Sequence, residues 1–98
     1  MELLSNAQKK RLKSLGHALN PVVMVGQHGL KETTQEDIVT ALAFHQLIKI
    51  KVSVGDRDAR NEVIEKIVED SNAELIQRVG NIALLYKRNK KKENILKA

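Results

Sequence analysis

Two glycines separated by two polar residues are the first feature of this sequence that could do chemistry, in the segment Gly26-Gln27-His28-Gly29. A wholly apolar run, residues 22–25, precedes them, and a helical pattern follows. Glycine lets the main chain approach a ligand closely, and the free N–H groups at a helix start favour an anion. The segment therefore predicts a loop that holds a phosphate group, although an ordinary strand-to-helix turn has a similar composition.

Polar side chains in and near this loop suit the same ligand. Gln27 and His28 occupy its tip and can donate hydrogen bonds to phosphate or sugar, while Lys31 could add a point charge. Four further cations in the first helix would enlarge the surface that contacts phosphate groups: Lys9, Lys10, Arg11 and Lys13. Together with Gly26 and Gly29, these side chains are the predicted contacts to a nucleic-acid backbone.

The formal net charge of +5 is unevenly distributed along the 98 residues. Residues 1–31 hold five basic side chains and one acidic side chain, and residues 87–98 hold six basic side chains and one acidic side chain. Between them, residues 32–86 hold six basic and ten acidic side chains. Such segregation indicates a surface that attracts phosphate, although charged side chains also simply keep a surface solvated.

Catalytic and metal sites are not expected. The chain has no cysteine, and the spacing of His17, His28 and His45 does not match a metal-ligand motif. His28 has no identifiable nucleophile or orienting carboxylate, and the loop lacks the Gly-Lys-Ser/Thr ending of a nucleotide hydrolase. We therefore expect a protein that is not an enzyme and that uses no cofactor, no metal and no small-molecule substrate.

Local patterns predict three helices and four strands. Ser5 and Gln8 form a capping-box pattern before a helix over residues 6–18, which Pro21 ends. A second helix starts between residues 31 and 33, with Thr33 and Glu36 as a possible cap, and a third spans 57–70 and stops near Asn72. Strands are expected over residues 22–25, 47–54, 74–79 and 82–87.

Hydrophobic patterns indicate how these elements pack. The run 22–25 is typical of a strand buried on both faces, whereas residues 47–54 alternate as a strand covered more on one side. Lys49 and Lys51 are interpreted as lysines that solvate a strand face or protect an edge, Tyr86 as a core residue, and His17 and His45 as partly buried helix residues. The predicted fold is α/β, of the two-layer α+β type, with the order α-β-α-β-α-β-β and a four-stranded mixed sheet.

The chain is expected to form one domain over residues 1–88, followed by a basic, mobile tail over residues 89–98. No apolar run reaches the roughly 20 residues that span a bilayer, and residues 1–6 lack the apolar stretch of a signal peptide. We expect a cytoplasmic monomer without a membrane partner.

Several motifs in order resemble one family. They are Leu12-Lys13, His17-Ala18-Leu19-Asn20-Pro21-Val22-Val23, Val25-Gly26-Gln27-His28-Gly29-Leu30, Leu47-Ile48-Lys49-Ile50-Lys51-Val52 and Leu84-Leu85-Tyr86-Lys87. Together they resemble the CRM domain (chloroplast RNA splicing and ribosome maturation) in its stand-alone bacterial YhbY-like form. The resemblance implies a fold related to the C-terminal domain of translation initiation factor three. It also implies RNA binding through the Gly-x-x-Gly loop and a basic surface, in precursors of the large ribosomal subunit.

Two features qualify this resemblance. The loop is also similar to that of KH domains, where it joins two helices rather than following a strand. Many family members have Lys or Asn inside the loop and Thr two residues after it, whereas this chain has Gln27, His28 and Lys31. The alternatives are a protein-interaction module and a general nucleic-acid-binding protein, including a DNA-binding one, without a ribosomal role.

Overall fold

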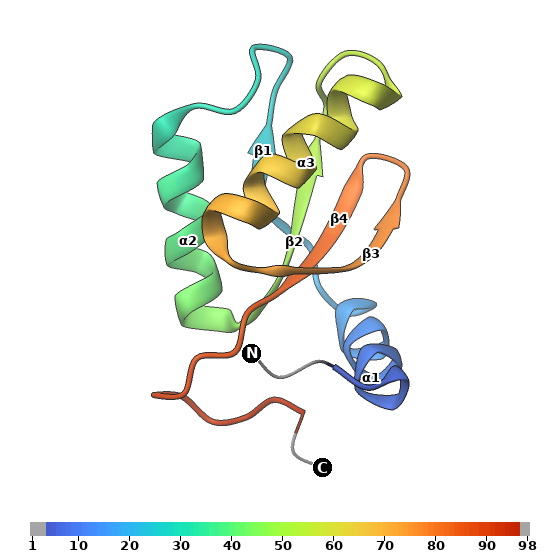
Figure 1. The fold of residues 1–98 in the computed structure, drawn as a ribbon, viewed down its shortest axis with the longest axis vertical. Coiled ribbons are helices and arrows are strands. Elements are labelled where there is room, and N and C mark those ends of the chain that lie inside the picture. The colour runs from blue at the N-terminus through green and yellow to red at the C-terminus, as the bar shows by residue number, and fades with distance from the viewer. Residues whose placement is uncertain (1–3, 97–98) are drawn as a thin grey trace.

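The computed structural model describes residues 4–96, which form three helices and four strands (Figure 1). In chain order they are α1 (Asn6–Gly16), β1 (Pro21–Val25), α2 (Glu32–His45), β2 (Leu47–Val52), α3 (Arg57–Ser71), β3 (Glu74–Val79) and β4 (Ile82–Tyr86). This order confirms the predicted α-β-α-β-α-β-β arrangement and the α/β class. In residues 4–96, no helix has the length and apolar content needed to cross a membrane.

The four strands form one mixed sheet in the order β1-β2-β4-β3. β1 runs parallel to β2, while β4 runs antiparallel to both β2 and β3. The chain reaches β2 from β1 through α2, which is the crossover that a parallel pair requires. Two positions define the ends of the central strand: Val52 pairs with Val25, and Leu47 pairs with Tyr86.

Helices cover the two faces of the sheet unequally. α2 and α3 pack on one face, where Ile38, Leu42, Ile64 and Ile67 contact the inward side chains of the strands. α1 packs on the other face through a smaller cluster that contains Leu12, Leu47, Ile76, Leu84 and Tyr86. The alternation of residues 47–52 explains this division, since successive strand side chains point to opposite faces. Tyr86 is buried, as predicted.

Local capping sets the helix starts. The Ser5 hydroxyl accepts a hydrogen bond from the Gln8 N–H, and the Gln8 side chain accepts one from the Ser5 N–H, which confirms the predicted capping box. The Asp56 carboxylate caps α3 by accepting from the Ala59 N–H at 2.8 Å. The possible cap by Thr33 and Glu36 is wrong, because α2 starts at Glu32 and no side chain caps it.

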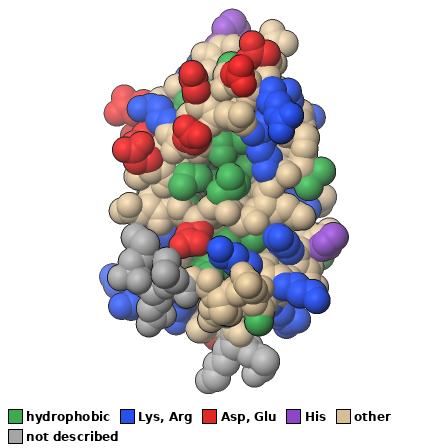
Figure 2. All heavy atoms as spheres, turned by 45° about the vertical axis from the view of Figure 1, so that its right-hand side comes forward, with side chains coloured by type: hydrophobic (Ala, Val, Ile, Leu, Met, Phe, Trp, Pro, Cys, Tyr) green, Lys and Arg blue, Asp and Glu red, His purple; other side chains and the backbone are tan. Residues whose placement is uncertain are grey.

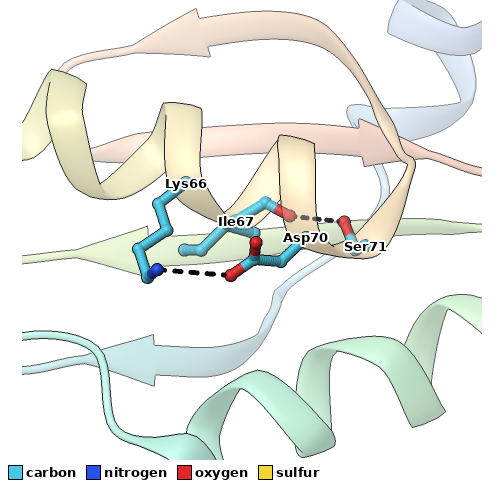
Figure 3. A network of polar contacts seen from close by, with 4 residues as sticks. All are labelled: Lys66, Ile67, Asp70 and Ser71. Carbon is cyan, nitrogen blue, oxygen red and sulfur yellow. Dashed lines mark hydrogen bonds and ion pairs between the residues drawn. The ribbon is translucent and has the colours of Figure 1, made fainter.

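The end of α3 shows how a helix stops at a buried position (Figure 3). The Ser71 hydroxyl is buried and donates to the Ile67 carbonyl at 2.6 Å. Asn72 then adopts the left-handed conformation, with φ of 56°, which confirms it as the stop. Lys66 and Asp70 form an ion pair at 3.6 Å, but both side chains are largely exposed, so the pair adds little stability.

Three expectations about burial and length were wrong. β1 is an edge strand, and Val22 and Met24 are 52% and 66% exposed, because α1 covers the face of its neighbours instead. His17 and His45 are exposed, since they lie at helix ends rather than inside the helices. α1 also ends at Gly16, two residues before the predicted end.

Residues 87–96 pass along the end of the sheet where β2 begins. The Lys87 N–H donates to the Gln46 carbonyl at 2.8 Å, and the Asn89 side chain donates to the Ala43 carbonyl at 2.8 Å. Ile95 and Leu96 pack against the cluster beneath α1. The domain boundary near residue 88 and the mobility of the tail stay predictions.

Candidate functional site

The Gly-x-x-Gly loop lies at the end of β1 and leads into α2 (Figure 1). The Gly29 N–H donates to the Gly26 carbonyl at 3.0 Å, so the four residues close a β-turn with Gln27 and His28 at its tip. Both tip side chains are exposed, as is Lys31 just after the turn. The structure therefore brings the predicted residues 26–29 and 31 together at one end of the sheet.

Each glycine of the loop has a different structural role. Gly29 has a φ of +85°, in a region that residues with a Cβ avoid. Gly26 has no such constraint. At both positions a Cβ atom would meet no other atom within 4 Å, so the main chain is open to a ligand on this side.

The start of α2 leaves backbone donors without a side-chain partner. Lys31 occupies the N-cap position in an extended conformation, and it makes no capping hydrogen bond. The first N–H groups of a helix have no partner within the helix and carry a partial positive charge. The turn and this helix start thus present helix N–H donors, Lys31 and two exposed hydrogen-bonding side chains within one short segment of the chain, which is chemistry suited to a phosphate group.

The four predicted cations of α1 are exposed but lie elsewhere: Lys9, Lys10, Arg11 and Lys13. α1 packs on the sheet near Leu47 and Tyr86, whereas the loop follows Val25 at the opposite end of the strands. Figure 1 shows α1 at the bottom of the molecule and the loop between β1 and α2 at the top. One compact site therefore cannot contain both groups.

Sequence reasoning gave no functional role to Lys49 and Lys51. Both are half-buried on the sheet face that α1 only partly covers, and β2 is a central strand, so neither lysine protects an edge. Lys51 pairs with Met24, two residues before Gly26. The signal in the sequence was the alternation of lysine with isoleucine, but only the sheet order shows that these cations adjoin the loop.

Charge divides the surface between the two faces of the sheet. The helices of the α2–α3 layer hold most of the acidic residues: Glu32, Glu36, Asp37, Asp58, Glu62, Glu65, Glu69 and Asp70. In Figure 2 Asp and Glu side chains gather in the upper left, while Lys and Arg side chains lie on the right and over the lower end. A polyanion would be repelled by the helical layer and attracted to the other surfaces.

Polar and charged side chains outside the loop were also compared for possible sites. Within residues 4–96, no three His, Asp or Glu side chains come close enough together to hold a metal ion.

In α2, the side-chain amide of Gln35 is buried, and neither its nitrogen nor its oxygen has a hydrogen-bond partner in the described part of the chain. An unpaired buried amide lowers the stability of the folded protein relative to a hydrogen-bonded one.

Comparisons with known proteins agree with this fold. The chain is 45% identical over 87 residues to an RNA-binding protein of Haemophilus influenzae, covering 89% of this chain and 88% of that one. It is 39% identical to a protein of Pseudomonas aeruginosa named as a probable RNA-binding protein, covering 90% and 85% of the two chains. The solution structure of the Staphylococcus aureus protein SAV1595 matches with a TM-score of 0.75 and 32% identity, over 93% of this chain and 98% of that one.

The pattern that defines the CRS1/YhbY (CRM) domain matches residues 4–87. This range contains all three helices, all four strands and the Gly-x-x-Gly loop. The resemblance drawn from the motifs is thereby confirmed, and this chain belongs to the CRS1/YhbY (CRM) domain family.

Proposed function

We propose that this protein binds RNA through the Gly26–Gly29 loop and acts in assembly of the large ribosomal subunit, on ribosomal RNA in its precursors. The observation that carries the proposal is the open loop at the uncapped start of α2, which presents backbone N–H donors beside Lys31. The relatives from Haemophilus influenzae and Pseudomonas aeruginosa, both named for RNA binding, support the same class of function.

In this proposal the loop positions the RNA backbone and catalyses no reaction. Gly26 and Gly29 give a phosphate access to the main chain, while Gln27, His28 and Lys31 contact phosphate or sugar. Lys9, Lys10, Arg11 and Lys13 contact RNA at the α1 end. The protein acts as a cytoplasmic monomer without a cofactor, and its acidic helical layer faces away from the RNA.

The test is binding and co-sedimentation of the wild type and Gly26→Asp. We choose position 26 because the added carboxylate enters open space without the backbone strain expected at Gly29. It should repel phosphate and lower RNA affinity at least tenfold, with loss of co-migration with large-subunit precursors. Thr40→Asp adds the same charge at an exposed position of α2 and is the matched control.

The outcomes separate the parts of the proposal. Loss for Gly26→Asp alone, with an unchanged circular dichroism spectrum, supports the loop as the contact. Equal binding by wild type and Gly26→Asp would move the contact away from the loop. Wild-type protein that binds RNA yet never co-migrates with precursors would overturn the ribosomal role. An RNA affinity that does not change with salt concentration would overturn phosphate binding, since each neutralised phosphate adds about −0.7 to the slope of log affinity against log salt concentration.

A further inference from the structure

The sheet face beside the loop has a row of side chains that crosses all four strands. Met24 of β1 pairs with Lys51 of β2, Lys51 with Ile82 of β4, and Ile82 with Val79 of β3. Directly paired residues in a sheet point to the same face, so these four side chains form one continuous line. Because Met24 lies two residues before Gly26, the line begins next to the loop.

This row is exposed although it lies on a sheet. Met24 and Val79 are 66% and 65% exposed, and Lys51 and Ile82 are half-buried. α1 covers the part of this face around Leu84 and Tyr86, so the row remains open to solvent. Contiguous exposed apolar side chains rimmed by polar ones are typical of an interaction surface.

A second row leads from the first toward α1. Lys49 pairs with Leu84, and Leu84 pairs with Gln77. A hollow of about 290 Å³ lies here, lined by Gly16, His17, Lys49, Gln77, Val79, Ile82 and Leu84. Lys49 and Lys51 are two residues apart on one face, so they stand about 6.6 Å apart along the strand, a distance comparable to that between successive phosphates of an extended strand.

Within the described part of the chain, the cations of these rows have no acidic partner. Among residues 4–96 the one ion pair joins Lys66 and Asp70, on α3 and therefore in the other layer. Lys49 and Lys51 are free to bind an external anion. Apolar side chains beside them offer contact area to bases, which a duplex keeps stacked inside and a single strand exposes.

We propose that the open sheet face is the path of a single RNA strand, which leaves the Gly-x-x-Gly loop, passes Lys51 and Lys49 and reaches α1 at His17. This inference rests on the proposed function and deepens it by naming the form of RNA and its direction across the protein. The path also joins the loop to the cations of α1, which no compact site at the loop could include. Bases lie on Met24, Val79 and Ile82 by apolar contact, since the aromatic ring of this face, Tyr86, is buried beneath α1.

The absence of cysteine from the sequence allows a direct test by thiol protection. Single variants Met24→Cys and Val79→Cys place a thiol at the two exposed ends of the first row, and Val39→Cys places one on α2, where the side chain is 42% exposed. Each variant is alkylated with and without a saturating 12-nucleotide single-stranded RNA. At each position the alkylation rate without RNA is divided by the rate with RNA. This ratio corrects for the different solvent exposure of the three thiols.

We expect RNA to slow alkylation at positions 24 and 79 at least fivefold and to leave position 39 unchanged. The double variant Lys49→Gln, Lys51→Gln should have at least tenfold lower affinity for single-stranded RNA than the wild type. Equal protection at all three positions, or none at positions 24 and 79 while fluorescence anisotropy shows RNA bound, would overturn the path and leave the proposed function standing. Tighter binding of a duplex of equal length would overturn the single-stranded form, whereas no binding of any RNA would remove the proposed function itself.

Discussion

At the residue scale, the two glycines of the loop serve different purposes. Gly29 is required by the backbone, because its φ of +85° is costly for a residue with a Cβ. At Gly26 a Cβ would enter open space, so the fold does not require glycine there, and the proposed function gives this position the role of ligand access. The sequence alone does not distinguish the two positions, although only one of them is constrained by the backbone.

Alanine substitutions should separate these requirements. Gly29→Ala should lower the free energy of unfolding by about 1–2 kcal/mol through backbone strain. Gly26→Ala should leave it unchanged or raise it by up to about 1 kcal/mol, because alanine restricts the unfolded chain. Urea denaturation of both variants measures the difference. Equal stability losses would contradict the assignment of the two roles.

At the element scale, α1 can pack on the sheet because its last residue is a glycine. Gly16 is buried, and a Cβ built there would lie 2.6 Å from Leu84 Cδ2 and 2.9 Å from Leu84 Cδ1. Leu84 is itself only 3% exposed, so its side chain would have to leave its packed position beneath α1 to make room for a Cβ. The contact fixes how closely α1 approaches β4 and thereby where the hollow next to Lys49 begins.

Gly16→Ala should therefore destabilise the protein. Overpacking costs about 1–3 kcal/mol, and alanine returns about 1 kcal/mol of helix propensity, so we expect a net loss of about 1 kcal/mol. Leu84→Val on the Gly16→Ala background should recover part of the loss relative to the sum of the single changes. Ser14→Ala, at an exposed position of the same helix, is the control. Purely additive effects in the urea measurements would show that the two side chains do not meet.

At the scale of the whole molecule, residues 87–96 contact the segment that joins α2 to β2. Gln46, which is 2% exposed, accepts hydrogen bonds at Oε1 from Arg88 Nη1 at 3.0 Å and from the Asn89 N–H at 3.1 Å. Its Nε2 donates to the Glu93 carbonyl at 2.8 Å. Lys92 also lies 4.3 Å from the centre of the Phe44 ring. These contacts bring the basic residues of the tail to the same end of the sheet as those of α1.

Removing these contacts should free the tail. Gln46→Met keeps the size of the side chain but removes three hydrogen bonds, so trypsin should cleave after Lys90, Lys91 or Lys92 at least threefold faster than in the wild type. Gln27→Met makes the same chemical change at an exposed loop position and should leave the cleavage rate unchanged. An equal rate for Gln46→Met and wild type would mean that the tail is mobile regardless of Gln46, as the sequence predicted.

The sequence by itself determined the elements, their order and the position of the Gly-x-x-Gly loop between a strand and a helix. The capping box of α1, the Asn72 stop of α3 and the alternation of residues 47–52 each depend on residues close together in the chain, so local physics suffices. The motifs also identified the family correctly.

Only the tertiary structure decided which surfaces are covered. It made β1 an edge strand rather than one buried on both faces, separated α1 from the loop, and placed Lys51 beside Met24 on an open face. These outcomes depend on pairing between distant segments: the sheet order β1-β2-β4-β3 comes from a crossover and two antiparallel pairings. An apolar run such as residues 22–25 looks the same in a central strand and at an edge, because its own residues do not determine what packs against it.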